Sequence, residues 1–168
     1  MIRLASLLRH PLMQQRSARM GRGAFLAQAE DFIEELRTRG PILPVQVGIP
    51  SSLKKQMEDQ GQTAPVPEEI PALVDTGASI TAIQVDTGQR LGLPVTGSIQ
   101  IGGATGVAQQ PVYGAFLKIT DPFIEFDPLR LAGAQLTSVP FQMLIGRDIL
   151  CKMLLAYDGK RGRFSLNF

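Results

Sequence analysis

The chain has 168 residues, of which 44% are hydrophobic, so it can bury one core and corresponds to one domain of ordinary size. Its single cysteine and single histidine exclude a disulfide scaffold and argue against Ser-His-Asp, Cys-His and histidine-metal chemistry within one chain. Carboxylates are therefore the expected catalytic groups if the protein is an enzyme. No apolar run approaches the roughly 18 residues that cross a bilayer, so we expect no integral membrane segment.

Charge is concentrated at the amino terminus. Residues 1–29 contain five arginines and no acidic residue, whereas the net charge of the whole chain is only +2. The rest of the chain is therefore net acidic, has few aromatic residues and shows no basic stripe, which argues against nucleic-acid binding. Arg9 and Pro11 interrupt the first apolar stretch, so it does not match a secretory signal. A mitochondrial transit peptide, which shares this Arg-rich composition, stays open as the weaker alternative.

Residues 24–37 carry apolar side chains at helical spacing, and Gly40-Pro41 ends the pattern. We expect an amphipathic helix that packs on the body of the protein. This helix divides the chain into a basic, helical extension over residues 1–40 and a body over residues 41–168.

The body is expected to be mostly β with short helices, because short apolar runs alternate there with Gly and Pro. Short helices are expected at 86–91 and 147–154. Residues 51–69 are expected to form a short helix that continues as a surface loop. Cys151, beside Leu150 and Met153, is expected to be buried. A hairpin is expected to join 154–157 to 163–168. The strand-like runs are 42–49, 72–74, 98–101, 112–119, 141–145 and 164–168.

Residues 72–79 read Ala-Leu-Val-Asp-Thr-Gly-Ala-Ser. An apolar strand here runs directly into Asp75, which places a carboxylate on a tight loop at the strand end. Gly77 permits a close backbone approach. We expect Thr76 to hydrogen-bond locally and Ser79 to offer a hydroxyl that orients Asp75.

This segment resembles the active-site loop of aspartic proteases. The resemblance implies that Asp75 is catalytic and that Thr76, Gly77, Ala78 and Ser79 line the site. A second Asp-Thr-Gly begins at Asp86, but its surroundings are typical of a helix start, so Asp86 is interpreted as a helix N-cap. The two copies lie too close in sequence to be the two halves of one internal dyad.

Residues 141–150, Phe-Gln-Met-Leu-Ile-Gly-Arg-Asp-Ile-Leu, resemble the late strand, glycine and helix of retropepsins, the single-lobe aspartic proteases. Many viral members have Asn where this chain has Asp148. We expect Arg147 and Asp148 to form a structural ion pair. The resemblance assigns the motif behind the site to Ile145, Gly146, Arg147 and Asp148.

Residues 98–119 have two strand-like arms and a Gly-rich centre, and they resemble the retropepsin flap that closes over substrate. A phosphate-binding loop is the weaker alternative, because no Lys-Ser/Thr pair and no obvious helix follow. The expected flap and substrate-binding residues are Ile101, Gly102, Gly103, Ala104, Thr105 and Gly106.

The resemblance covers about residues 41–168 and implies a single-lobe, closed β-barrel with a flap. It also implies a homodimeric endopeptidase that hydrolyses peptide bonds with water activated by Asp75 of each chain, without metal or organic cofactor. A non-catalytic peptide-binding or dimerisation module on the same fold is the alternative. We expect a bacterial, cytoplasmic protein. Residues 1–40 are open to interpretation as a pro-segment, a targeting signal or a packed helix.

Overall fold

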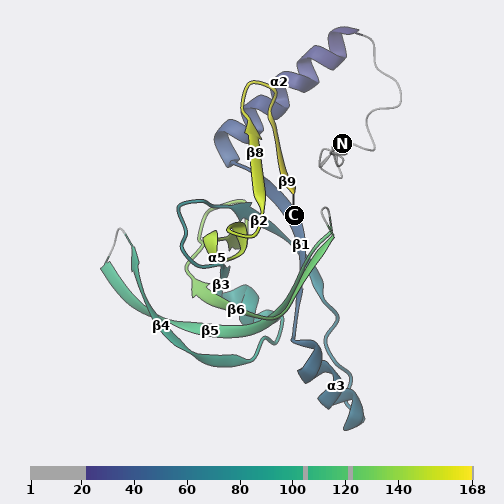
Figure 1. The fold of residues 1–168 in the computed structure, drawn as a ribbon, viewed down its shortest axis with the longest axis vertical. Helices are drawn as coiled ribbons and strands as arrows, with labels where there is room; N and C mark the ends of the chain where they lie inside the picture. The colour runs from purple at the N-terminus through teal and green to yellow at the C-terminus, as the bar shows by residue number, and fades with distance from the viewer. Residues whose placement is uncertain (1–21, 104–105, 121–122, 168) are drawn as a thin grey trace.

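A computed structural model describes residues 22–103, 106–120 and 123–167 (Figure 1). Its centre is a six-stranded barrel in the order β1-β2-β7-β3-β6-β5, which closes because β1 also pairs with β5. The pairs β2–β7 and β3–β6 are parallel, and the other pairs in the barrel are antiparallel. The barrel strands are β1 (Ile42–Gly48), β2 (Glu68–Val74), β3 (Ala82–Gln84), β5 (Gly106–Ile119), β6 (Ile124–Ala134) and β7 (Met143–Ile145).

Alternating side chains of the strands fill the barrel. In β1, Leu43, Val45 and Val47 are buried, whereas the intervening Pro44 and Gln46 are half-buried. This period of two is what a strand with one face on a core requires. Closure leaves the six barrel strands without a free edge inside the ring. The single-lobe closed barrel expected from the sequence is therefore confirmed.

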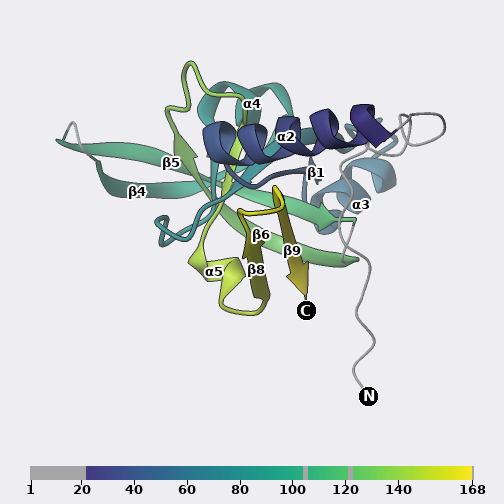
Figure 2. The same ribbon diagram turned by 90° about the horizontal axis from the view of Figure 1, so that it is seen from above.

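The flap is a long hairpin of β4 (Val95–Gly103) and β5, paired from Val95↔Tyr113 to Gly103↔Gly106. It extends away from the barrel in both ribbon views (Figures 1 and 2). Its arms are longer than the predicted 98–101 and 112–119. Ala104 and Thr105, predicted at its tip, lie outside the described residues.

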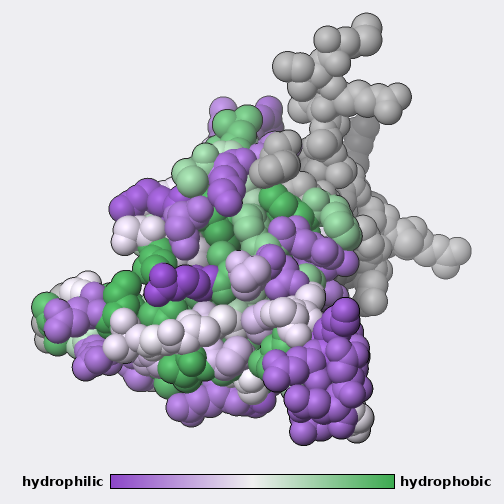
Figure 3. Space-filling view, turned by 60° about the horizontal axis from the view of Figure 1, so that its bottom comes forward, coloured by the Kyte–Doolittle hydropathy of each residue, from purple (hydrophilic) through white to green (hydrophobic). Residues whose placement is uncertain are grey.

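Two helices lie outside the barrel. Helix α2 (Arg22–Arg39) precedes β1, and α3 (Ser51–Asp59) follows it. The backbone N–H of Ser51 donates to both carboxylate oxygens of Asp127 at 3.2 Å, so β6 caps the start of α3. Helix α3 forms the hydrophilic lobe at the lower right of Figure 3. Among the described residues, no helix is long and apolar enough to cross a membrane.

The chain ends in a separate two-stranded sheet, β8 (Leu154–Asp158) and β9 (Arg163–Asn167), which confirms the predicted hairpin. Helix α2 crosses the turn end of this hairpin (Figures 1 and 2). The Tyr157 hydroxyl donates to the Leu36 carbonyl at 3.4 Å, and Leu36 is buried. The predicted helix 24–37 is thus present and packed, although the division of the chain at residue 40 stays a prediction.

Several predicted boundaries are wrong. Strand β2 begins at Glu68 inside the predicted loop, and β7 begins only at Met143. Helix α5 (Arg147–Leu150) is half as long as expected, because β8 begins at Leu154. Cys151 follows α5 and is exposed, not buried.

Strand β6 was not predicted at all. Pro128 interrupts its sequence, and a proline removes a ladder hydrogen-bond donor from a strand. The structure accommodates it at an irregularity, where the register with β5 shifts between Ala115 and Leu117 and skips Asp127-Pro128. Strand β3, with three residues, was also missed because it is too short to show periodicity.

Candidate active site

The carboxylate of Asp75 stands at the end of β2. The backbone N–H of Asp75 donates to the Ile145 carbonyl at 3.0 Å, which continues the parallel pairing of β2 with β7. Its Oδ1 accepts a hydrogen bond from the Gly77 N–H at 2.8 Å. The side chain is half-buried, whereas Thr76 and Gly77 are exposed. Asp75 is therefore a fixed carboxylate that solvent can reach.

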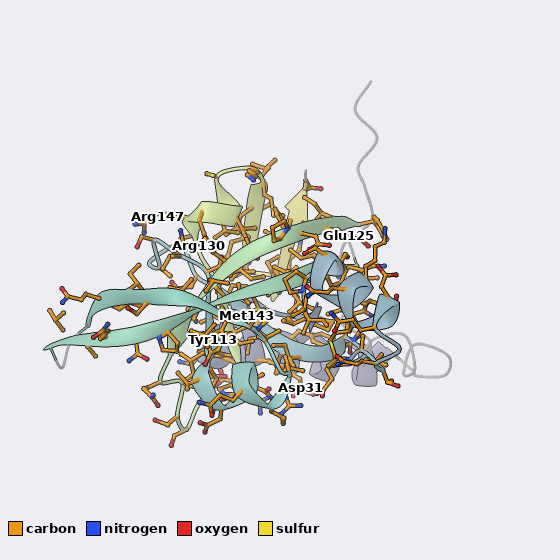
Figure 4. The ribbon with its side chains drawn as sticks, turned by 90° about the horizontal axis from the view of Figure 1, so that it is seen from below. Asp31, Tyr113, Glu125, Arg130, Met143 and Arg147 are labelled. Atoms are coloured by element: carbon orange, nitrogen blue, oxygen red, sulfur yellow. The ribbon has the colours of Figure 1, made fainter. Side chains whose placement is uncertain are left out.

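The loop after Asp75 is held by Arg147. The backbone N–H of Arg147 donates to the Ala78 carbonyl at 2.9 Å. Its guanidinium Nη1 donates to the Thr76 carbonyl at 2.8 Å and the Gly77 carbonyl at 3.0 Å. Figure 4 shows Arg147 at the periphery of the molecule, whereas Met143 lies near its centre. Three successive loop carbonyls thus find their donors on one residue.

Asp148 holds the far end of the same loop. Its Oδ1 accepts from the Thr81 hydroxyl at 2.6 Å, and its Oδ2 accepts from the Thr81 N–H at 3.0 Å. The same hydroxyl accepts from the Gly146 N–H at 3.1 Å. An acid suits this position because it meets donors only. The departure from the Asn of many viral retropepsins is therefore chemically consistent.

Gly146 brings these two segments into contact. A Cβ built there would lie 2.5 Å from the carbonyl carbon of Ile80 and 2.8 Å from the nitrogen of Thr81. Both are backbone atoms that cannot move aside at low cost, so only glycine fits. The predicted motif from Ile145 to Asp148 thus lies directly against the predicted loop from Asp75 to Ser79.

Two details of the sequence prediction are wrong, and one residue was missed. In the described structure no ion pair joins Arg147 to Asp148, because each bonds a different part of the loop. The hydroxyls of Thr76 and Ser79 have no hydrogen-bond partner within the described residues, and the oxygen of Asp75 is bonded by the Gly77 N–H instead. The sequence reasoning also missed Thr81, for which the only signal is a lone hydroxyl between Ile80 and Ala82.

The second Asp-Thr-Gly lies in helix α4 (Val85–Arg90), which begins directly after β3 ends at Gln84. Asp86 is inside its first turn and Gln84 is the N-cap, so the predicted N-cap role of Asp86 is wrong. The Thr87 hydroxyl donates to the Gln142 side-chain oxygen at 3.1 Å. Burial raises the pKa of the neighbouring Tyr113, and the charge of Asp86 raises that pKa further. Thr87 and Gly88 of this copy are buried, and Gly88 lies against the Tyr113 ring, so these two residues serve packing.

The flap residues that the structure describes belong to the two arms. Ile101 is half-buried and Gly102 is exposed. Gly103 pairs with Gly106 at the last described step of the hairpin. Within the described residues, no group of three or more His, Cys, Asp or Glu side chains is arranged to hold a metal ion.

Comparison with known proteins assigns the chain. Residues 67–158, more than half of its length, match the family described as aspartyl protease. This chain belongs to the aspartyl protease family. The matched region runs from the start of β2 to the end of β8, so it contains both Asp75 and Asp148. Family membership classes the chain with the peptidases. No curated protein matches it.

Solved structures similar to this aspartyl protease include two viral enzymes and one cellular domain. The EIAV protease complexed with the inhibitor HBY-793 is 22% identical, with a TM-score of 0.46 over 70% of this chain and 89% of that one. The simian foamy virus (mac) protease is 16% identical, with a TM-score of 0.37 over 65% of this chain and 92% of that one. The retroviral protease-like domain of Ddi1 from Leishmania major is 20% identical, with a TM-score of 0.42 over 74% of this chain and 87% of that one.

Proposed function

We propose that this protein is an aspartic endopeptidase whose active unit is a homodimer, with Asp75 of each copy supplying one carboxylate of the dyad. The observation that carries the proposal is the placement of Asp75. Its carboxylate stands on a rigid loop at a strand end, open to solvent, inside the region that matches the aspartyl protease family.

Two copies are needed because one chain offers one suitable carboxylate. Of the two Asp-Thr-Gly sequences, only that of Asp75 lies on the loop held by α5, and that of Asp86 is built into α4. A twofold axis beside the Asp75 loop brings two identical loops together, since an isologous interface places the same surface on both copies.

The chemistry follows from two carboxylates at close range. Like charges so close cannot both ionise, so one carboxylate stays protonated while the other is charged. The charged carboxylate takes a proton from a water molecule, and the protonated one donates to the oxygen of the scissile carbonyl. The water oxygen attacks the carbonyl carbon as its proton leaves. The peptide C–N bond then breaks as its nitrogen receives the proton that was taken from water, and the other carboxylate recovers its proton from a hydroxyl of the intermediate. This reaction calls for neither metal nor organic cofactor.

The proposed substrate is a peptide or an unfolded protein in extended conformation. Among the described strands, β4 pairs only with β5, so its outer edge carries free backbone donors and acceptors. Such an edge suits recognition of an extended chain by strand addition. A bacterial cytoplasm is the proposed location, with mitochondria as the alternative.

Two matched Asp→Asn variants test the assignment. Asp75→Asn is expected to lower cleavage of an unfolded protein by at least about 10²–10⁴-fold, because it removes the acid–base group. It should leave the circular dichroism spectrum and the dimer mass unchanged.

The control is Asp86→Asn, which makes the same chemical change in the second Asp-Thr-Gly and should retain nearly full activity. Full activity in the Asp75 variant would overturn the assignment. A wild-type dimer that binds peptides without cleaving them between pH 3 and pH 8 would instead support a non-catalytic peptide-binding module.

A further inference from the structure

One peptide group connects a cation to the proposed catalytic carboxylate. The carbonyl oxygen of Thr76 accepts a hydrogen bond from Arg147 Nη1 at 2.8 Å. The N–H of the same planar peptide unit, which belongs to Gly77, donates to Asp75 Oδ1 at 2.8 Å. The guanidinium and the carboxylate are therefore bonded to opposite ends of one dipole.

We infer that Arg147 is a positioning residue, which orients the Asp75 carboxylate through this peptide group. The inference rests on the proposed function for its catalytic meaning. A charge-assisted hydrogen bond on the carbonyl polarises the peptide unit and strengthens the donation by its N–H. A stronger and more linear donor holds the carboxylate oxygen in one orientation.

Arginine suits this role because its guanidinium is planar and always charged. The same Nη1 also reaches the Gly77 carbonyl at 3.0 Å, so the orientation of two consecutive peptide groups is fixed by one side chain. The backbone of Arg147 is bonded to the loop as well, through Ala78. The Arg147 side chain is exposed, so water and salt screen its through-space electrostatic interaction with Asp75. Arg147 therefore acts on Asp75 through the hydrogen-bonded peptide group.

The other charged groups near the loop are few. Asp148 lies on the same helix and faces Thr81. Strand β7, which pairs with β2, and strand β3, which follows the loop in sequence, carry no charged residue. Glu68 and Glu69 lie at the end of β2 opposite to Asp75. In the proposed dimer the second copy's Asp75 is the remaining charge. Arg147 is thus the one cation bonded to the loop among the described residues.

The direct test is the amide proton of Gly77, followed by proton–nitrogen NMR of the full-length protein. Arg147→Gln removes the cation and is expected to accelerate exchange of this proton with solvent at least about threefold, because the peptide group is no longer held toward Asp75. Arg147→Lys retains a charge but loses the planar guanidinium, and should give a smaller acceleration. Arg130→Gln, an equal change of charge at an exposed position of β6, should give none.

Activity supplies a second readout. In Arg147→Gln the value of kcat should fall about 10-fold with KM changed less than about twofold, since the substrate does not need Arg147 to bind. Arg147→Lys should recover part of the lost kcat, and Arg130→Gln should keep the wild-type value.

The outcomes separate the two proposals. Unchanged exchange of the Gly77 amide proton in folded Arg147→Gln overturns the inference, whatever the enzyme cleaves. Accelerated exchange in a protein that cleaves no peptide supports the inference and rejects the proposed function. If Arg147→Gln does not fold, Arg147→Lys carries the test, and an exchange rate in Arg147→Lys equal to that of Arg130→Gln overturns the inference.

Discussion

The hydroxyl of Thr81 is the most constrained side-chain group of the site. Thr81 has no exposed surface, and its hydroxyl both donates to Asp148 and accepts from the Gly146 N–H. These bonds connect the end of the Asp75 loop to the start of α5. A buried hydroxyl that uses both its donor and its acceptor holds one arrangement of the two segments and excludes others.

Thr81→Val keeps the shape of this side chain and removes both hydrogen bonds. The buried Gly146 N–H then has no partner, so we expect a loss of about 2–3 kcal/mol in the free energy of unfolding. Chemical denaturation measures this loss. Thr137→Val, at an exposed position after β6, is the matched control and should change stability by less than about 0.5 kcal/mol. Equal stability of the two variants would contradict the role given to Thr81.

Helix α2 and the β8–β9 hairpin form a unit beside the barrel. Gly162, in the turn of the hairpin, adopts φ +62°, and a Cβ there would lie 2.5 Å from the nitrogen of Ile33. The carbonyl carbon of Phe32 would be 2.6 Å away. Backbone therefore meets backbone at this contact, and only glycine permits it.

Gly162→Ala is expected to loosen α2 from the hairpin. The clash with the backbone of α2 and the positive φ together cost about 1–3 kcal/mol. Hydrogen exchange of the α2 amides near Ile33 should accelerate, while exchange in the barrel strands should not change. Gly159→Ala is the control from the same turn, because its nearest contact is the Tyr157 ring edge at 3.3 Å. Unchanged exchange in α2 would show that the close approach does not hold the helix.

At the scale of elements, the sequence predicts strands that alternate and motifs that have fixed chemistry. The pattern of β1 and the Asp75 loop were both recognisable for this reason. Strand β6 was not, because Pro128 breaks its pattern and only pairing with β5 and β3 makes it a strand. The partners of Arg147 and Thr81 were also out of reach, since they lie about 70 residues away along the chain.

The whole molecule is half of the proposed catalytic unit. A closed barrel supplies one rigid loop with one carboxylate, and the flap hairpin extends beyond the barrel. The match over residues 67–158 shows the family, but the sharing of an active site between two copies belongs to an assembly. Mixed dimers of wild-type and variant chains test this sharing most directly.

Co-expression of wild-type and Asp75→Asn chains in equal amounts, each with its own tag, provides this measurement. If each active site needs Asp75 from both copies, random pairing leaves about a quarter of the dimers active. The activity per total chain should then be about a quarter of that of the wild-type protein. An activity of about one half would show that each chain works alone, and would contradict a dyad shared between two copies.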